Sequence, residues 1–434
     1  MRSTARRHAP AWVMAVAALV VAGPAFGAAF SIFEQGTKAM GMAGAFTAQA
    51  DDPSAMFHNA AGLAFQHERE FALGVTYIRS LEADLVGLDP FPGAGYTAEQ
   101  ETLSEFPPHA YWVQPLSANW TFGLGVNAPF GLTTEWQDPA TFRGRFISQM
   151  ASLQAVDFNP TFAWQVTPDF GIGFGGIARV SSVELERHVP QFDPFTQTIA
   201  DVATLKLEGD LDNEGFGWNA GLLHKATSRF TWGLSYRSAV DIDYEGDARL
   251  TQNLTGTPFD QLVRGALPFD VDFPVETRID FPDTASLGLA YVVTPAVLVE
   301  LDLNWTGWSS FQELPITFPE GQLPSQLVPQ RYSDANHYRL GLLIGPHASQ
   351  WRAGVVFDET PQPEEAVGPL LPDADRWGFT LGYGHQGGVD FDVALMYLIF
   401  DDRTRDQSFA DEPASTFFAT YNQEAVLLGL TLGF

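Results

Sequence analysis

The chain has 434 residues, a formal net charge of −29 and no cysteine, and 13% of its residues are aromatic while only 17% are charged. The acidic balance excludes a nucleic-acid-binding protein, because phosphate contacts need clustered Lys and Arg. The lack of cysteine excludes disulfide and thiolate chemistry. Low charge combined with 40 Gly and 35 Phe is typical of a strand-rich wall that is apolar on one face.

The first segment predicts a secretory signal peptide over residues 1–27. A basic start (residues 2–7) precedes an apolar run (residues 12–22), and small residues stand before a cut ahead of Ala28. The apolar run is shorter than the roughly 20 residues that a helix needs to cross a bilayer. No later stretch reaches that length without Asp, Glu, Gly or Pro. A closed barrel is therefore the remaining way for the mature chain to span a membrane.

Residues 28–66 differ from the rest of the chain. The runs GMAGAFTAQADD and SAMFHNAAGLAF have the small-residue composition of short helices broken by Gly and capped by Asp and Ser. We expect this segment to fold inside a wide barrel as a hatch, or plug, with a loose periplasmic tail as the alternative. The plug is favoured by its apolar side chains, which are Phe46, Met56, Phe57, Leu63 and Phe65.

Residues 67–434 show recurrent alternation of apolar and polar side chains, which predicts strands. We count fifteen strand-like runs, and we merge two of them across Pro282 into one strand over 275–293 because bacterial barrels have even strand counts. The prediction is an all-β membrane protein, a fourteen-stranded antiparallel transmembrane β-barrel. A β-sandwich would also alternate, but its strands are shorter and its outer faces carry more charge.

The junctions between these strands alternate in length, as in outer-membrane barrels with tight periplasmic turns and long outer loops. The short junctions lie near residues 114–119, 166–169, 225–229, 293–296, 345–350 and 383–388. The long, Pro-rich and acidic junctions lie near 80–108, 129–152, 188–214, 247–270, 309–335, 359–374 and 401–423. Seven outer loops and six turns place both chain ends in the periplasm, so we expect a protein of the Gram-negative outer membrane.

Several segments, taken in order, resemble the FadL/TodX family of outer-membrane transporters of long-chain fatty acids and other hydrophobic compounds. Residues 28–66 are similar to the hatch of that family. NAPFGLTTEW (127–136), NWTGWSSFQEL (304–314) and LPDADRWGFTLGYG (371–384) are similar to its barrel signatures. The terminal Phe434 is similar to the aromatic residue that barrel-assembly machinery reads. The likeness covers nearly the whole mature chain.

The resemblance implies a route for the substrate. Outer loops would catch it, an apolar pocket would hold it, and it would leave sideways into the membrane through a gap at an inward kink of the third strand. Here Asn127, Pro129 and Gly131 would border that lateral opening, because Pro cannot donate to a strand ladder and Gly weakens it. Alternatively, Pro129-Phe130-Gly131 simply begins the outer loop.

The gate of the hatch is expected at Phe57, His58, Asn59, Ala60 and Ala61. The family often carries Asn-Pro-Ala near this point, where this chain has Asn59-Ala60-Ala61. Without the proline, the backbone loses a fixed φ and regains a donor. Gating that depends on a kink there is therefore in question, whereas the plug itself is not.

Two sets of side chains are candidates for substrate binding. Apolar loop residues would capture a hydrophobic molecule, because each buried CH₂ is worth about 0.8 kcal/mol, although packing within the loops is the alternative. These residues are Phe91, Phe106, Phe192 and Phe195. A carboxylate head group would need a cation inside the barrel, where a charged strand residue is tolerated. The candidates are Arg179, Arg187, Arg331 and Arg339, each with a structural or rim role as the alternative.

No catalytic constellation stands out, since the nine His are scattered without H-E-x-x-H or metal spacing. We therefore expect no enzyme, metal or cofactor. The acidic runs 358–365 and 401–407 could bind divalent cations that bridge lipopolysaccharide, or be solvated loops.

The sequence predicts a monomer that passively takes up long-chain fatty acids or other hydrophobic compounds and contacts outer-membrane lipid and lipopolysaccharide. The alternatives are a general aqueous porin, which needs no plug, and an outer-membrane lipid-acting enzyme or adhesin. Whether the cargo is a fatty acid or an aromatic hydrocarbon is left open.

Overall fold

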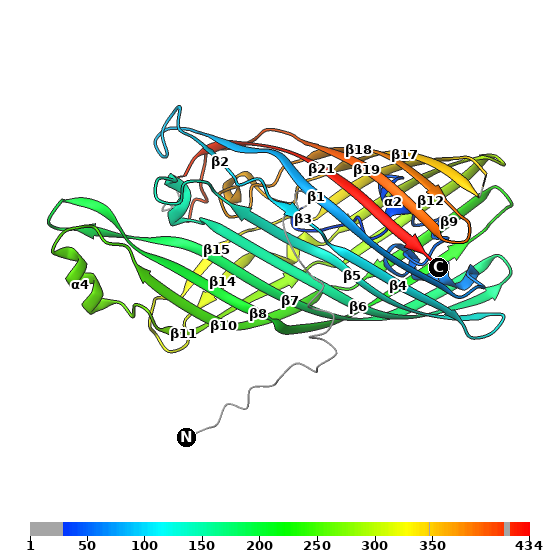
Figure 1. Cartoon of the computed structure of the whole chain (residues 1–434), viewed down its shortest axis with the longest axis horizontal. Helices are drawn as coiled ribbons and strands as arrows, with labels where there is room; N and C mark the ends of the chain where they lie inside the picture. The colour runs from blue at the N-terminus through cyan, green and yellow to red at the C-terminus, as the bar shows by residue number, and fades with distance from the viewer. Residues whose placement is uncertain (1–28, 347, 412–416) are drawn as a thin grey trace, which may run out of the picture.

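A computed structural model describes residues 29–346, 348–411 and 417–434 of the chain, so the predicted signal peptide lies outside the described residues. Strands dominate this part of the chain and form one closed antiparallel barrel, seen from the side in Figure 1. Within the described ranges, no helix is both long and apolar enough to cross a membrane.

The wall strands, in chain order, are β1 (Glu70–Gly87), β4 (Pro108–Pro115), β5 (Trp120–Glu135), β6 (Met150–Thr167), β7 (Phe170–Asp193), β8 (Thr198–His224), β9 (Phe230–Arg237) continued by β10 (Val240–Gln252), β11 (Asp272–Phe281) continued by β12 (Thr284–Thr294), β13 (Val297–Thr306), β16 (Ala335–Ile344), β17 (Ser349–Asp358), β18 (Arg376–His385), β19 (Asp390–Phe400) and β21 (Ala419–Gly433). The short strands are β2 (Thr97–Glu99), β3 (Ser104–Glu105), β14 (Glu313–Thr317), β15 (Gln326–Pro329) and β20 (Arg403–Arg405). The helices are α2 (Thr37–Met40), α3 (Ala55–His58), α4 (Phe259–Ala266) and the 3₁₀ turns η1 (Ala60–Phe65), η2 (Arg143–Phe146), η3 (Trp308–Ser310) and η4 (Glu364–Ala366).

The barrel closes between its first and last strands, which pair from Ala72↔Gly433 to Gly87↔Ala419. With β9–β10 and β11–β12 each counted as one strand, the ring has fourteen strands, so the predicted fold is confirmed. The strand predicted over 275–293 is divided at Pro282, between β11 and β12. Pro282 has no N–H to donate to the ladder, which explains the break.

One predicted outer loop is largely strand, and a second is strand at both of its ends. The region 188–214 continues β7 and β8 almost to the tip of their hairpin, and β5 and β6 extend into the region 129–152. Figure 1 shows this hairpin projecting with α4 at one end of the barrel. Apolar side chains such as Leu185, Leu205 and Leu250 pack together there, so the strands keep a hydrophobic core beyond the membrane-facing wall.

The outer surface of the wall changes character along the barrel axis. Exposed side chains toward the turn end are large and apolar, for example Phe162, Phe174 and Phe216. Toward the loop end the exposed positions become acidic, as at Asp241 and Asp243 on β10. An apolar band followed by a charged one is the surface expected of a barrel that crosses a membrane and projects beyond it.

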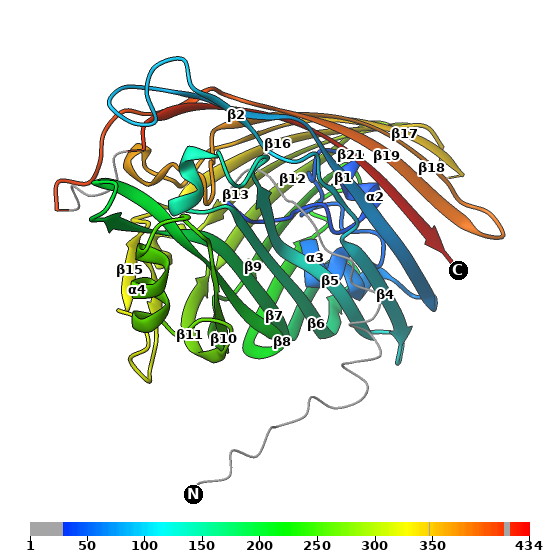
Figure 2. The ribbon, with the colours of Figure 1, turned by 60° about the vertical axis from the view of Figure 1, so that its left-hand side comes forward.

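The N-terminal segment lies inside the barrel, where Figure 2 shows α3 within the ring of strands. Almost every side chain from Ala29 to Ala64 is buried. Inward-facing glycines make room for it: a Cβ at Gly221 would overlap Asn59 Oδ1, and one at Gly173 would overlap the backbone of Ala60. Close approach of two backbones is a common reason for glycine within a strand.

Candidate binding site and lateral opening

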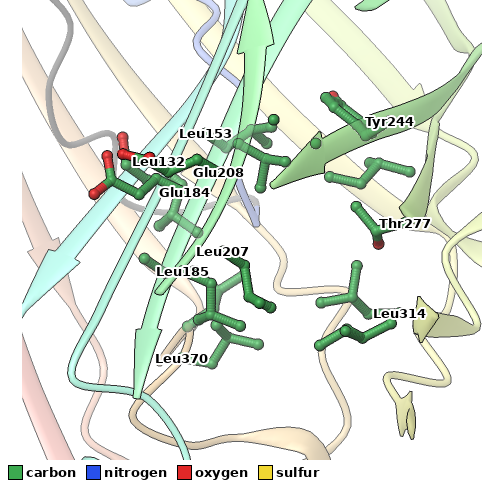
Figure 3. A pocket seen from close by; sticks show the side chains of 18 of the residues that line it. Leu132, Leu153, Glu184, Leu185, Leu207, Glu208, Tyr244, Thr277, Leu314 and Leu370 are labelled. Carbon is green, nitrogen blue, oxygen red and sulfur yellow. The ribbon is translucent and has the colours of Figure 1, made fainter. Parts of the chain in front are cut away.

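An apolar cavity, here the outer cavity, lies between β5–β8 and β10–β11 in the loop half of the barrel. It contains about 830 Å³ of unfilled space, counting the part open to solvent. Figure 3 shows leucine side chains from several strands converging on it, among them Leu132, Leu153 and Leu207. The carboxylates of Glu184 and Glu208 extend away from these leucines, and Glu184 Oε1 lies 2.8 Å from Lys206 Nζ. The outer cavity therefore presents an uncharged, apolar surface.

The floor of the outer cavity is an aromatic cluster built around Phe30 of the N-terminal segment. The Phe30 ring centroid lies 4.6 Å from that of Trp308, 5.5 Å from Phe311 and 6.0 Å from both Phe130 and Phe281. Most of these contacts are edge-to-face, the arrangement that aromatic pairs favour. The cluster thus lies between the outer cavity, which Phe30 lines, and a second cavity, which Phe130 lines.

Below Phe30 lies a second cavity, here the inner chamber, whose lining includes four arginines. Arg179 Nε lies 2.7 Å from Asp157 Oδ1, and Arg237 Nη2 lies 3.0 Å from Asp157 Oδ2. The other two arginines, Arg339 and Arg376, likewise share the buried carboxylate of Asp358, at 3.2 and 2.7 Å. Each carboxylate serves two guanidinium groups, so these four arginines carry more positive charge than the two aspartates neutralise.

Among the described residues, Nη1 of Arg237 and both ring nitrogens of His58 are buried beside the inner chamber without a hydrogen-bond partner. Burial, together with the charges of Arg339 and Arg237, lowers the pKa of the His58 imidazole to about 3. A neutral imidazole and an unsatisfied guanidinium N–H beside a cavity form a setting in which an anionic or strongly polar group would be stabilised.

The hydrogen-bond ladder is interrupted along one side of β5. The ladder between β4 and β5 ends at Ala110↔Val126 and resumes only at Gln100↔Trp136. Between these points the structure describes every residue, and no ladder pair joins 102–109 to 127–134. This unpaired stretch is called the lateral window. The third strand is thus kinked rather than ended at Pro129, because β5 continues to Glu135 with a register shift against β6 between Asn127 and Phe130.

At the window, the N-terminal segment takes the place of β4. The Ile32 N–H donates to Pro129 O at 2.8 Å, and the Gly131 N–H donates to Phe30 O at 3.0 Å. This contact lies between the two cavities, since Phe30 lines the outer cavity and Pro129 lines the inner chamber. The window, the two cavities and the N-terminal segment therefore meet at one place.

Two inward carboxylates of β13 hold the N-terminal segment from the opposite wall. Asp302 Oδ2 accepts from the N–H groups of Phe46 and Thr47, both at 2.9 Å. Glu300 Oε1 accepts from Ala48 N at 2.6 Å, and its two oxygens lie 3.2 and 3.1 Å from Gln49 N. Together these two side chains accept from four successive backbone N–H groups, those of residues 46–49. Across the described ranges, no group of three or more His, Cys, Asp or Glu is placed to hold a metal ion.

Several residues singled out from the sequence come together at this site. Arg179, Arg339, Phe57 and His58 line the inner chamber. The expected lateral residues Asn127, Pro129 and Gly131 all lie on β5 in the lateral window. The expected gate residues Asn59, Ala60 and Ala61 pack instead against β7 and β8, where Asn59 Nδ2 donates to Leu222 O at 3.1 Å.

The remaining candidates lie away from both cavities. Phe91 packs on Phe417 in the outer loops, and Phe106 packs on Tyr77 outside the wall. Phe192 and Phe195 are 57% and 55% exposed at the tip of the β7–β8 hairpin. Arg187 binds Gln326 at 2.8 Å, and Arg331 pairs with Asp411 at 2.5 Å.

The sequence interpretation missed much of the site. Arg237 and Arg376 occupy inward strand positions like Arg179, so the same alternation would have identified them. Leu132 and Leu207 of the outer cavity also alternate inward, but they lie in regions whose composition predicts loops. No local pattern marks Gln35, which contacts a strand 93 residues away.

Comparison with known proteins gives one consistent result. The profile of the family described as outer membrane protein transport protein (OMPP1/FadL/TodX) matches residues 18–434. A long-chain fatty acid transport protein of Escherichia coli is 25% identical over 410 residues, covering 88% of this chain and 90% of the relative. A 47 kDa outer membrane protein of Pasteurella multocida is 27% identical over 398 residues, covering 89% and 90%.

Solved structures share the barrel. A FadL homologue of Pseudomonas aeruginosa has a TM-score of 0.79 at 22% identity, covering 94% of this chain and 99% of its own. The toluene transporter TbuX of Ralstonia pickettii has a TM-score of 0.65 at 18% identity, covering 92% and 99%. At 22% and 18% identity, the likeness to these two structures shows that the fold is shared.

Proposed function

Since the chain belongs to the OMPP1/FadL/TodX family of outer-membrane transport proteins, we propose that it passively takes up long-chain fatty acids through the lateral window. One observation carries the proposal: an uncharged outer cavity is followed, past Phe30, by an inner chamber lined by arginines. A molecule with a long apolar chain and one anionic end matches this order of surfaces. As a member of a family of transporters, the protein is not an enzyme.

The proposed route begins at the exposed tip of the β7–β8 hairpin, where Phe192 and Phe195 offer an apolar landing surface. The acyl chain then enters the outer cavity, where each CH₂ removed from water contributes about 0.8 kcal/mol. Residues 29–66 block the direct path to the periplasm, so the cargo leaves through the window into the membrane. In this proposal Asn59, Ala60 and Ala61 seal the lumen against β7 and β8 and do not border the exit.

A neutral hydrocarbon is the second candidate cargo. The carboxylates of Glu184 and Glu208 extend away from the outer cavity, which leaves it without a charge to bind a head group. A toluene-like molecule would fill the outer cavity and need none of the arginines. The two candidates therefore differ in whether the inner chamber matters.

We also propose that the protein acts as a monomer within outer-membrane lipid and lipopolysaccharide. The last strand, β21, presents alternating apolar side chains, and Phe434 beyond it is 64% exposed. This end of the chain has the form of a recognition signal for barrel-assembly machinery. A monomer seen in detergent by light scattering would support the proposed state.

The test compares palmitate with hexadecane on the Arg237→Gln variant. Loss of a charged hydrogen-bond donor is worth about 1.5–3 kcal/mol, so we expect palmitate affinity to fall roughly tenfold or more while hexadecane binding stays unchanged. Arg249→Gln is the matched control, because Arg249 is exposed on the outer face and pairs with Asp272. Unchanged palmitate affinity in Arg237→Gln would favour a neutral cargo, and swelling of liposomes by sugars would favour a porin.

A further inference from the structure

The side chain of Gln35 behaves like a strand partner for Ala128. Its Oε1 accepts from the Ala128 N–H at 2.9 Å, and its Nε2 donates to Ala128 O at 2.7 Å. The backbone of Gln35 is fixed in turn, because the Tyr111 hydroxyl donates to Gln35 O at 2.6 Å. Gln35 is 1% exposed, so these bonds are formed away from water.

Ala128 is the first residue of the bulge in β5. In a regular barrel, its N–H and C=O would pair with either β4 or β6. The register shift removes the pairing with β6, and the window removes the pairing with β4. The carboxamide of Gln35 therefore satisfies two backbone groups that would otherwise be buried without partners, at a cost of about 1–3 kcal/mol each.

Both edges of the window still match in length. The pairs Ala110↔Val126 and Gln100↔Trp136 belong to the same register, so residues 102–109 and 127–134 contain equal numbers of residues. Prolines at 107, 108 and 129 remove N–H donors near the lower end of the window, which is the end at the Ala110↔Val126 pair. The upper end, which includes Leu103 and Thr133, contains no proline and could resume the ladder if β5 moved outward.

We propose that Gln35 is the positioning residue of the lateral window: its carboxamide holds the β5 bulge inward on the N-terminal segment and thereby keeps the wall open. Without it, β5 relaxes toward residues 102–106 and the window narrows. The consequence for transport rests on the proposed function, whereas the change in wall geometry does not.

The test is disulfide formation across the window in a chain that has no cysteine of its own. Leu103→Cys and Thr133→Cys place thiols on positions that become directly opposite when the ladder closes. Paired antiparallel residues have Cα atoms about 4.5–5.5 Å apart, within the range that a disulfide can bridge. We expect Gln35→Met, which keeps the size but loses the amide, to raise the cross-linking rate roughly tenfold.

The matched control is Gln66→Met. Gln66 is also a buried glutamine of the N-terminal segment, but its Nε2 donates to Asp52 O within that segment. Cross-linking should therefore stay at the parental rate in Gln66→Met. Equal cross-linking rates in Gln35→Met and the parent would overturn the proposal.

A milder second variant covers the case in which Gln35→Met does not assemble. Tyr111→Phe removes only the hydroxyl that fixes the Gln35 backbone, and it should raise cross-linking in the same direction by a smaller factor. Transport gives a separate readout: Gln35→Met should bind palmitate normally yet take it up more slowly. If even the parent takes up no palmitate, the proposed function fails while the cross-linking result still decides the role of Gln35.

Discussion

The attachment of the N-terminal segment to β13 yields a prediction that can be worked out from the structure. Alanine at both Glu300 and Asp302 removes the acceptors of four backbone N–H groups, those of residues 46–49. A buried donor left without a partner costs about 1–3 kcal/mol. Water will enter the space left by the side chains, so we take the lower value for each donor.

Leaving four N–H donors without partners then destabilises the attached segment by about 4 kcal/mol. Each 1.4 kcal/mol is about a tenfold change in an equilibrium constant, so detachment of the segment should become roughly a thousandfold more frequent. Planar-bilayer recording should show long openings to small ions in the double variant, because residues 29–66 would no longer block the lumen.

The control is Asp241→Ala with Asp243→Ala on β10. This pair has the same spacing along a strand but faces outward and contacts Arg278. Its conductance should equal that of the parent. If the Glu300 and Asp302 double variant also conducts like the parent, the carboxylates do not hold the segment and the reasoning is wrong.

Three further predictions concern the lumen. The pKa of His58 is lowered to about 3, so below about pH 6.5 an unpacked His58 takes up a proton while the packed one does not. The packing of the N-terminal segment therefore becomes less stable as the pH falls from about 6.5 to 3. Leakage of small solutes should rise over that pH range, and it should rise more in the parent than in His58→Phe. Gly221→Ala should raise small-solute leakage, because the new Cβ overlaps Asn59 Oδ1, whereas Gly176→Ala meets no atom within 4 Å and should not. Phe30→Ala should join the two cavities, and the crystal structure of that variant with palmitate should show one continuous ligand density across them.

The barrel could be predicted because its wall obeys a simple pattern. Alternation in β5 and β21 reports which face meets lipid, and a closed ring in which all neighbours are antiparallel has an even number of strands. The extended ends of β7 and β8 were missed because their outward positions are acidic and resemble loop residues. Only the packing of Leu205 and Leu207 against side chains of other strands shows that these segments are strands.

The sequence predicted site residues only where the alternation of inward and outward side chains along a strand was enough to place them. Arg179 and Arg339 were found because inward arginines need a polar or enclosed setting, while Arg331 follows the same composition but lies in an outer loop and pairs with Asp411. The window depends on Gln35 meeting Ala128, a contact between distant parts of the chain. No spacing rule along the sequence encodes such a contact, so it required the structure.

The most direct test of the account is to seal the lateral window and follow uptake. Barrels that carry both Leu103→Cys and Thr133→Cys, once oxidised to the disulfide, should take up almost no palmitate, and a reductant should restore the rate of the unsealed protein. Binding of palmitate to the outer cavity should be the same before and after sealing. Uptake at the full rate through a sealed wall would show that the cargo leaves by another path, and the proposed lateral exit would have to be abandoned.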